Sequence, residues 1–346
     1  MSTTPSFQVG ATVRLPRPEV PKSTGRATIA TLQGDDQTAC VIWESLAPEP
    51  ISFNASTCTV GKPKRRLKRP FLVAPVMDGK DTDETETTVE LSELQALLDF
   101  ELTTEKHSDD VAVWKERGDQ LLRLGDASAA CSYYEAALRL SSILQVGSAI
   151  VMKAGGHAKI ADVDCLDDDD DEEGIEISLA DGQDLKISEA DIYLCILYND
   201  DEEHLQERIL LNLTRCMLQL AELAKHMTSR PLYFKSAVLA STLALTIANH
   251  HKEEEEDNNN NNNLTSLEQT ALLLRSQAQG GLAKFQHAIA DTKRLLQYDP
   301  NHKQAKKQWQ SLQGQQQKQK QVEKKLVKSM CQWVQTATDD DPKLLG

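Results

Sequence analysis

The chain has 346 residues and a formal net charge of −15, with 40% hydrophobic but only 5% aromatic residues. This length allows two or three domains, and a negative charge of this size argues against a general affinity for nucleic acid or anionic membrane. The seven cysteines are scattered and never spaced Cys-x-x-Cys, which argues against a disulfide framework or a cysteine zinc site and suits a reducing compartment. Leu and Ala dominate the apolar residues and favour helix over strand.

Residues 1–75 predict a small β barrel with a basic tail. Short β-rich runs at 27–32 and 39–43 alternate there with Pro and Gly turns, and the first ten residues show no secretory signal. Residues 76–90 are acidic and Thr-rich without an apolar period, which predicts a flexible linker. Leucines at helical spacing in 91–100 predict a leading helix.

A dense basic run lies at the end of the first region. Its cations are Lys62, Lys64, Arg65, Arg66, Lys68 and Arg69. Such a run suits a nuclear-localisation signal or an arm that contacts phosphates. It equally suits a solvated loop that pairs with the acidic stretches 78–90 or 167–173, and the sequence leaves both interpretations open.

One segment of the chain is repeated. Residues 7–13 align with 144–150, and residues 25–32 align with 156–163. An acidic loop and another strand candidate follow each copy, so we expect the same small barrel twice, with the second copy inserted at 143–198. The order of these motifs resembles that of SH3-like and Tudor-like barrels. This resemblance implies either a structural spacer or a module that binds peptides or nucleic acid through its loops.

Small and large residues follow a specific pattern after the first region. Its positions are Trp114, Gly118, Leu121, Gly125, Ala130, Tyr134 and Ala137. The small side chains allow two antiparallel helices to approach closely, while the large ones fill the groove between them. The pattern resembles one tetratricopeptide repeat (TPR) almost position for position. The resemblance implies a stack of helical hairpins that binds other proteins.

The predicted hairpins continue to the end of the chain. The first hairpin, with the leading helix, spans 91–142, the second spans 199–250, and the third with a long C-terminal helix spans 266–336. A Glu- and Asn-rich tract at 251–265 predicts disorder, and residues 337–346 form a tail. The predicted fold class is mainly α: a three-repeat TPR helical solenoid with a long C-terminal helix, plus the two SH3-like or Tudor-like β barrels.

The third hairpin closes with Tyr298-Asp-Pro-Asn301 and leads into a long helix that includes Val322-Glu-Lys-Lys-Leu-Val-Lys-Ser-Met330. Over 114–333, without the inserted barrel, the chain resembles the C-terminal half of FKBP-type immunophilin co-chaperones. The first hundred residues lack that family's isomerase pattern. The resemblance implies a groove in which two Lys, one Arg and two Asn hold the acidic tail of a heat-shock chaperone.

Only part of that clamp is present in this chain. The groove positions are Lys115, Asp119, Asn212, Thr270, Leu274 and Arg275. Lys115 and Asn212 match the family, but Asp119 replaces an Asn. Thr270 and Leu274 replace a Lys and an Arg, and Arg275 lies one residue away, on another helix face. Each lost charge-assisted hydrogen bond costs about 1.5 to 3 kcal/mol, so we expect weak binding of a chaperone tail and favour a less acidic peptide.

The end of the long helix is basic and amphipathic. Its residues Lys324, Lys325, Leu326, Met330 and Trp333 suit a calmodulin-type groove, and the immunophilin resemblance implies such a site in this region. The alternative, which we favour, is a capping helix that covers the last repeat.

The sequence contains no catalytic motif that we recognise. The eight histidines show no ligand spacing, and no phosphate loop, Ser nucleophile elbow or His-Glu-x-x-His is present. The consecutive carboxylates of 167–173 lack the interleaved ligands of a calcium loop and predict a mobile hairpin tip. We therefore expect no enzyme activity, no cofactor and no metal site.

These patterns favour a non-enzymatic scaffold, cytoplasmic or nuclear, whose TPR groove binds a partner peptide. Neither membrane nor nucleic acid is an expected partner. One alternative is a diverged immunophilin relative, a peptidyl-prolyl isomerase by family, that binds heat-shock chaperones. Another is a nuclear chromatin- or RNA-associated factor that uses the barrels and the basic run.

Overall fold

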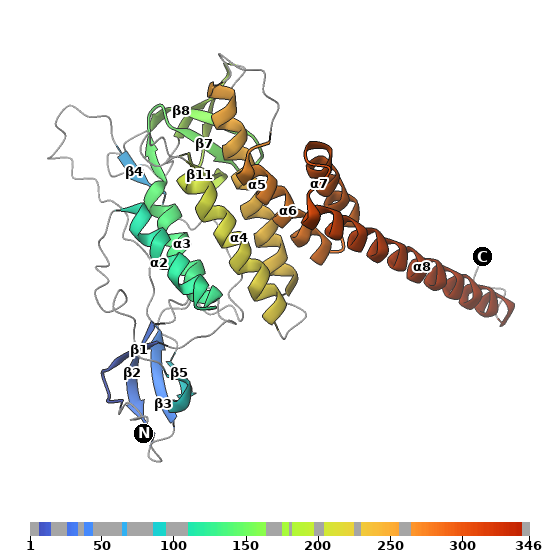
Figure 1. Cartoon of the computed structure of the whole chain (residues 1–346), viewed down its shortest axis with the longest axis horizontal. Helices are drawn as coiled ribbons and strands as arrows, with labels where there is room; N and C mark the ends of the chain where they lie inside the picture. Colours follow the sequence, from blue (N-terminus) through green and yellow to red (C-terminus); the bar gives the residue numbers. More distant parts are fainter. Residues whose placement is uncertain are drawn as a thin grey trace.

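The computed structural model contains seven α-helices that follow one another in its described part, with an antiparallel sheet near each end of the first hairpin (Figure 1). The structure describes residues 7–14, 26–33, 38–43, 64–67, 86–94, 110–163, 175–179, 182–196, 204–224, 230–255 and 264–340. The acidic loop 167–173 and most of the Glu- and Asn-rich tract lie outside these residues.

The helices are α2 (Val111–Arg123), α3 (Ala127–Ser141), α4 (Leu205–Leu223), α5 (Arg230–Glu255), α6 (Ser266–Gly281), α7 (Phe285–Tyr298) and α8 (Lys303–Asp340). Each helix packs against the next one, so that α2/α3, α4/α5 and α6/α7 form three hairpins. The first helices of the hairpins also contact one another, α2 with α4 and α4 with α6. This is the hairpin stack that the TPR pattern predicts.

The strands are β1 (Thr12–Arg14), β2 (Arg26–Leu32), β3 (Thr38–Trp43), β4 (Lys64–Arg66), β5 (Glu86–Glu90), β6 (Ile143–Gln145), β7 (Ala149–Met152), β8 (His157–Val163), β9 (Ile175–Ser178), β10 (Asp184–Ile187) and β11 (Ile192–Cys195). They form a four-stranded sheet β1-β2-β3-β5, a five-stranded sheet β10-β9-β8-β7-β11 and the pair β4-β6. The prediction of two barrels is wrong in this respect, because neither sheet closes on itself.

The two sheets repeat the same hydrogen bonds. Gly10 N donates to Ile29 O at 2.8 Å, and Gly147 N donates to Ile160 O at 2.7 Å. Both glycines have positive φ, +83° and +90°, which glycine adopts without steric cost. A register shift follows each of these isoleucines in its pairing with the next strand. The internal repeat in the sequence therefore corresponds to a repeated sheet geometry.

Part of the predicted acidic linker and part of the basic run form strands. Residues 86–90 of the predicted linker form β5, which pairs with β3, because their β-branched residues suit an edge strand. A 3-10 turn, Leu91–Glu93, follows β5 in place of the start of the predicted leading helix, whose residues 95–100 lie outside the described part. Residues 64–66 of the basic run form β4, whose backbone pairs with β6, and are therefore a strand and not a loop.

Helix α3 is the most deeply buried helix of the first hairpin. Arg139 is the only one of its residues that is not buried. Asp126 caps its N-terminus by accepting a hydrogen bond from Ala129 N at 2.9 Å, and the same carboxylate pairs with Arg14 of β1 at 2.8 Å. Burial raises the pKa of the Asp126 carboxyl despite these two partners. The Arg14–Asp126 ion pair joins the N-terminal sheet, which has its own small core, to the helices.

The inserted sheet shares its core with the helices. Buried residues of β6 to β9 and β11 form one continuous cluster with those of α2 to α6. Gln206 at the start of α4 fixes this junction, because its Nε2 donates to Ser141 Oγ of α3 and to the carbonyl of Cys195 of β11, both at 2.9 Å. The insertion is therefore an integral part of the helical domain and does more than space the hairpins.

Helix α5 is longer than predicted, since it continues to Glu255, into the tract expected to be disordered. By length and composition its segment Arg230–Lys252 could cross a membrane, but 61% of that segment is buried within the protein. It packs between α4 and α6, as a core helix does. Helix α8 likewise continues to Asp340, past the predicted start of the tail.

A substitution of Gly118 tests the close approach of α2 and α3. A Cβ atom at this position would lie 2.7 Å from the ring of Tyr134, which is itself fully buried. We expect Gly118→Val to lower the free energy of unfolding by about 1–3 kcal/mol through overpacking, measured by urea denaturation. The control is Gly314→Ala in α8, where a Cβ meets nothing within 4 Å, and this change should leave stability unchanged or slightly raised. Equal effects of the two changes would contradict the packing argument.

Arg14→Met tests the pair between the N-terminal sheet and α3. It leaves the buried Asp126 carboxylate without its cation, and breaking a buried pair costs about 3–5 kcal/mol. The double variant Arg14→Met/Asp126→Asn keeps a capping side chain without a buried charge, and it should recover most of the loss in urea denaturation. Arg123→Met, at an exposed position of α2, is the control. A double variant no more stable than Arg14→Met would refute the pairing.

Candidate functional site

The first two hairpins present a polar network on their first helices. Asp119 Oδ2 of α2 accepts a hydrogen bond from Lys115 Nζ at 2.7 Å, while its Oδ1 accepts from Asn212 Nδ2 of α4 at 2.7 Å and from Tyr134 of α3 at 2.6 Å. Arg215 donates in turn to Asn212 Oδ1. We call these five residues the Asp119 network.

The Asp119 network is accessible to solvent on one side. The side chains of Lys115 and Asp119 are 20% and 23% exposed, and Arg215 is exposed, whereas Tyr134 is buried. Burial, with the hydrogen bond to Asp119, raises the pKa of the Tyr134 hydroxyl, so it remains a proton donor at neutral pH. The network thus holds two cationic side chains, Lys115 and Arg215, and one carboxylate, Asp119.

Asp119 accepts the hydrogen bonds that Lys115 and Asn212 would donate to a bound peptide, according to the family resemblance. Lys115 and Asn212 are the two clamp residues that match the co-chaperone family, and both donate to this one carboxylate. An incoming carboxylate would have to displace a side chain that is already in place. The structure thus brings Lys115, Asp119 and Asn212 together, with their hydrogen bonds made to one another.

The third hairpin does not join this network. Arg275 of α6 forms a two-pronged ion pair with Asp291 of α7, at 2.8 and 2.7 Å. Thr270 bonds back to the carbonyl of Ser266, and Leu274 packs against the core. Within the described residues, no hydrogen bond or ion pair links these side chains to Lys115 or Asp119. Arg275 therefore fastens its own hairpin together.

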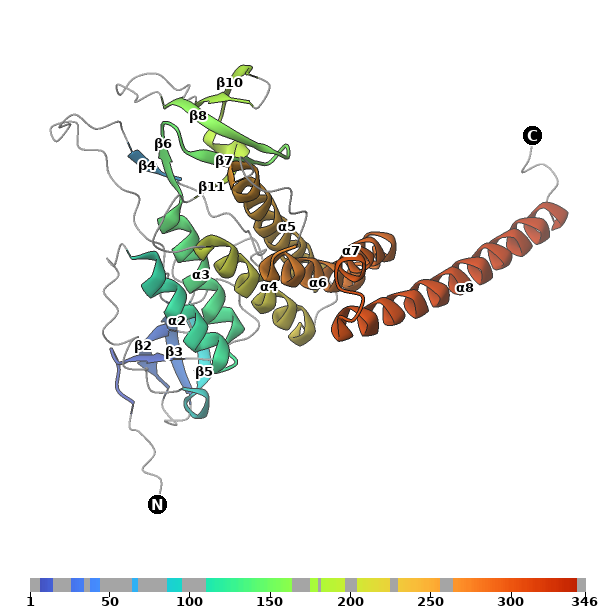
Figure 2. The ribbon, with the colours of Figure 1, turned by 45° about the horizontal axis from the view of Figure 1, so that its top comes forward.

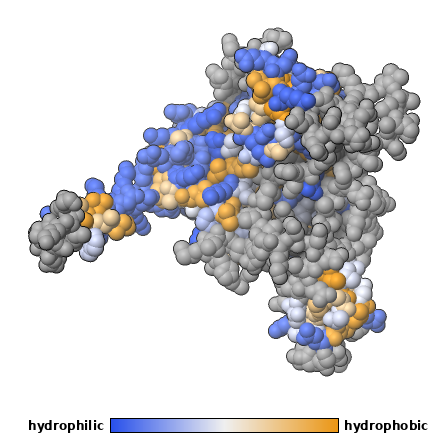
Figure 3. Space-filling model, turned by 180° about the vertical axis from the view of Figure 1, so that it is seen from behind, coloured by the Kyte–Doolittle hydropathy of each residue, from blue (hydrophilic) through white to orange (hydrophobic). Residues whose placement is uncertain are grey.

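Only the first part of α8 caps the last hairpin. Ala305 and Leu312 are buried there, and α8 contacts α6 and α7. Beyond this point α8 extends away from the body (Figure 2), and its apolar side chains are exposed: Val322, Leu326, Val327, Met330, Trp333 and Val334. Apolar surface is visible near its far end in Figure 3. The capping interpretation is therefore wrong for the segment that includes Lys324, Lys325, Leu326, Met330 and Trp333.

Of the basic run, only the strand β4 can be placed. Its backbone pairs with 143–145, and Leu67 beside it is buried against the helical core. Lys62, Lys68 and Arg69 lie outside the described residues.

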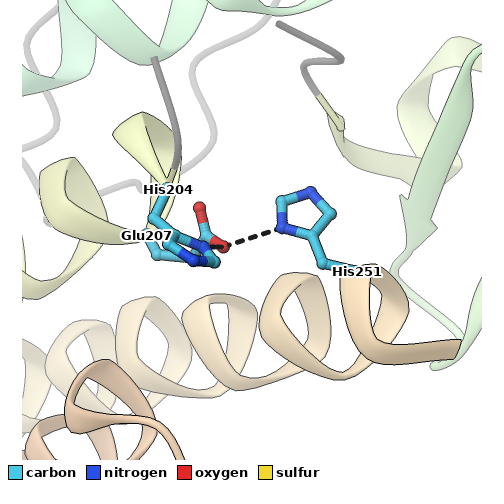
Figure 4. Close-up of side chains that lie close together, drawn as sticks. All are labelled: His204, Glu207 and His251. Atoms are coloured by element: carbon cyan, nitrogen blue, oxygen red, sulfur yellow. Dashed lines mark hydrogen bonds and ion pairs between the residues drawn. The ribbon is translucent and has the colours of Figure 1, made fainter. Parts of the chain in front are cut away.

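A cluster of histidines and one glutamate lies at the junction of α4, α5 and the inserted sheet (Figure 4). Glu207 Oε1 contacts His204 Nδ1 at 3.0 Å and His251 Nδ1 at 3.1 Å. Next to His251, the ring of His250 lies 4.9 Å from that of His157 of β8. These histidines show no ligand spacing in the sequence, yet the fold brings them together.

This cluster has little signal in the sequence. His204 and Glu207 share one helical turn at α4, but His251 comes from the far end of α5 and is brought in by the antiparallel hairpin. Burial alone would raise the pKa of the Glu207 carboxyl, but hydrogen bonds from His251 and His204 outweigh it and hold the pKa below its usual range. The carboxylate is thus ionised at neutral pH.

Comparison with known proteins adds little to this description. No protein-family model and no curated protein matches the chain, so neither supports a relation to immunophilins. The solved structure of the Arabidopsis OM64 TPR domain is similar, with 15% sequence identity over 59% of this chain and 95% of that domain, and a TM-score of 0.30. The chain is mainly helical, with helices α2 to α8 packed in sequence as TPR-like hairpins.

Proposed function

We propose that the protein is a non-enzymatic scaffold that binds a partner peptide on the first helices of its hairpins. The Asp119 network carries this proposal. It sets a Lys, an Arg and an Asn on adjacent helices, in fixed positions and partly open to solvent. Fixed cations and amide donors are what a peptide's carboxylates and carbonyls require.

The chemistry of the network favours a partner less acidic than a chaperone tail. Asp119 repels an incoming carboxylate and already takes the hydrogen bonds of Lys115 and Asn212. The third hairpin supplies no further cation, because Arg275 is held by Asp291. A peptide that offers carbonyl or amide groups avoids the repulsion.

The exposed second half of α8 supports a second binding surface on the same scaffold. It combines a row of apolar side chains with Lys320, Lys324, Lys325 and Lys328, and has Glu323 as an acidic neighbour. An acidic, apolar groove of the calmodulin type would complement it. Burial of the apolar row in such a groove would remove it from water, which stabilises a complex.

The other two functions have less support. An isomerase domain would need the first hundred residues, whose described part forms an open four-stranded sheet. A nuclear role would use the basic run as an accessible segment, but residues 64–66 of that run form strand β4, which pairs with β6. A cytoplasmic or nuclear location remains part of the proposal.

Asp119→Asn tests the self-satisfied network. It removes the repulsive charge and frees Lys115, so we expect a short peptide with a free C-terminal carboxylate and an acidic side chain to bind about ten- to a hundredfold more tightly, the equivalent of one charge-assisted hydrogen bond. Isothermal titration calorimetry measures the change. Adding Lys115→Ala to this variant should abolish the gain.

The matched control is Glu116→Gln, which makes the same charge change at an exposed neighbouring position of α2. It should leave the affinity nearly unchanged, since screened surface charges contribute little. The proposal fails if both changes act equally, or if neither Asp119→Asn nor Lys115→Ala alters binding.

Trp333→Glu tests the second surface. Trp333 is 71% exposed and is the largest apolar side chain on the free part of α8. We expect the full chain to bind calcium-loaded calmodulin, and the substitution to weaken binding at least about thirtyfold, as removal of a central aromatic anchor does. Gln317→Glu, the same charge change at an exposed position nearer the body, should have little effect. Absence of calmodulin binding would refute this part.

A further inference from the structure

We propose that His204, Glu207 and His251 bind a divalent transition-metal ion of the zinc class. Their ligand atoms, two imidazole nitrogens and one carboxylate oxygen, all lie within 4.8 Å of one another. Two His and one Glu are a ligand set that zinc takes, with water or another small ligand in the fourth position. The proposal does not depend on peptide binding by the Asp119 network.

The distances suit such an ion. Zinc bonds of 2.0–2.1 Å in tetrahedral geometry place neighbouring ligand atoms roughly 3.3 Å apart. Here Glu207 Oε1 lies 3.0 Å from His204 Nδ1 and 3.1 Å from His251 Nδ1. These two distances need to lengthen by only roughly a few tenths of an ångström to admit the ion, while the two imidazole nitrogens, which lie within 4.8 Å of each other, would adjust toward the same spacing. Figure 4 shows both rings turned toward the same carboxylate.

The three donors are held by the helices around them. Glu207 is in the first turn of α4 and its side chain is 2% exposed, while His251 lies on α5, which packs along α4. His204 caps α4 with φ of +63°, a left-handed conformation that a residue other than glycine rarely adopts. Its Nδ1 already lies 3.0 Å from Glu207 Oε1, so the donor set is organised before an ion arrives.

Local charge also suits a cation. The positive N-terminal end of α4 opposes a bound cation, but the negative C-terminal end of α5 lies on the other side of the site and offsets it. The buried Glu207 carboxylate supplies a full negative charge at the centre. The side chains of His204 and His251 are 25% and 24% exposed, so an ion can enter from solvent and keep a water ligand.

The competing explanation is that the same contacts are ordinary hydrogen bonds from two imidazoles to a buried carboxylate. It predicts a stabilising role for the three side chains but no affinity for metal. Binding of metal, and its dependence on each ligand, therefore separates the two explanations.

The experiment uses the full chain after treatment with a chelator and dialysis. Zinc is titrated in competition with a chromophoric chelator, and Co²⁺ replaces zinc in a parallel titration followed by its visible absorption, which is intense for four-coordinate sites. We expect one ion per chain. Glu207→Gln and His251→Gln should each lower the affinity more than about a hundredfold, beyond the 10- to 100-fold cost of losing an outer-shell partner.

His287→Gln is the matched control, because His287 is an exposed histidine on α7 away from the cluster. The zinc affinity of this variant should equal that of the wild type. Circular dichroism checks the fold of each variant. Should Glu207→Gln unfold the chain, His204→Asn carries the test, since Asn tolerates the left-handed conformation and leaves the buried carboxylate in place. Absence of zinc competition and of the cobalt band, or equal affinity in the ligand variants and His287→Gln, would overturn the proposal.

Discussion

The burial of α3 is the constraint on which the rest of the structure depends. Its small residues let α2 and α4 pack on its sides, and its two ends carry the two sheets. Asp126 at the N-terminus binds Arg14, and Ser141 at the C-terminus binds Gln206. Because close packing tolerates little change in volume, α3 helps to position both candidate sites. Tyr134 of α3 bonds to Asp119, and Glu207 lies in the first turn of α4, which packs on α3.

The two candidate sites differ in how their buried charge is satisfied. At Asp119 the carboxylate is neutralised by Lys115 and bonded by neutral donors, which suppresses affinity for a second carboxylate. At Glu207 the partners are imidazoles, whose ring nitrogens can exchange a hydrogen bond for a metal bond. A carboxylate between helices is thus the centre of both the proposed peptide site, where it is partly exposed, and the proposed cation site, where it is buried.

The duplicated sheet shows how one sequence pattern takes two roles. Both copies keep the glycine turn and the bonds of Gly10 and Gly147. The first copy folds around its own core and, in the described part of the chain, is joined to the helices by the Arg14–Asp126 ion pair. The second has its apolar residues continuous with the helical core, because it begins directly after α3 and ends just before α4. Because the two copies have similar strands, the elements packed against each copy decide whether it forms a core of its own or shares the helical core.

The sequence by itself determined the elements whose signal is local: the hairpin pattern from Trp114 to Ala137 and the repeated Gly-centred turns. Strand β5 was missed because an edge strand with one paired neighbour has little apolar periodicity. Only the tertiary structure decided that Asp119 fills its own clamp, that Arg275 serves its own hairpin and that His251 meets Glu207. Each of these depends on which residues of distant helices face one another, and helix periodicity in one segment carries no information about that.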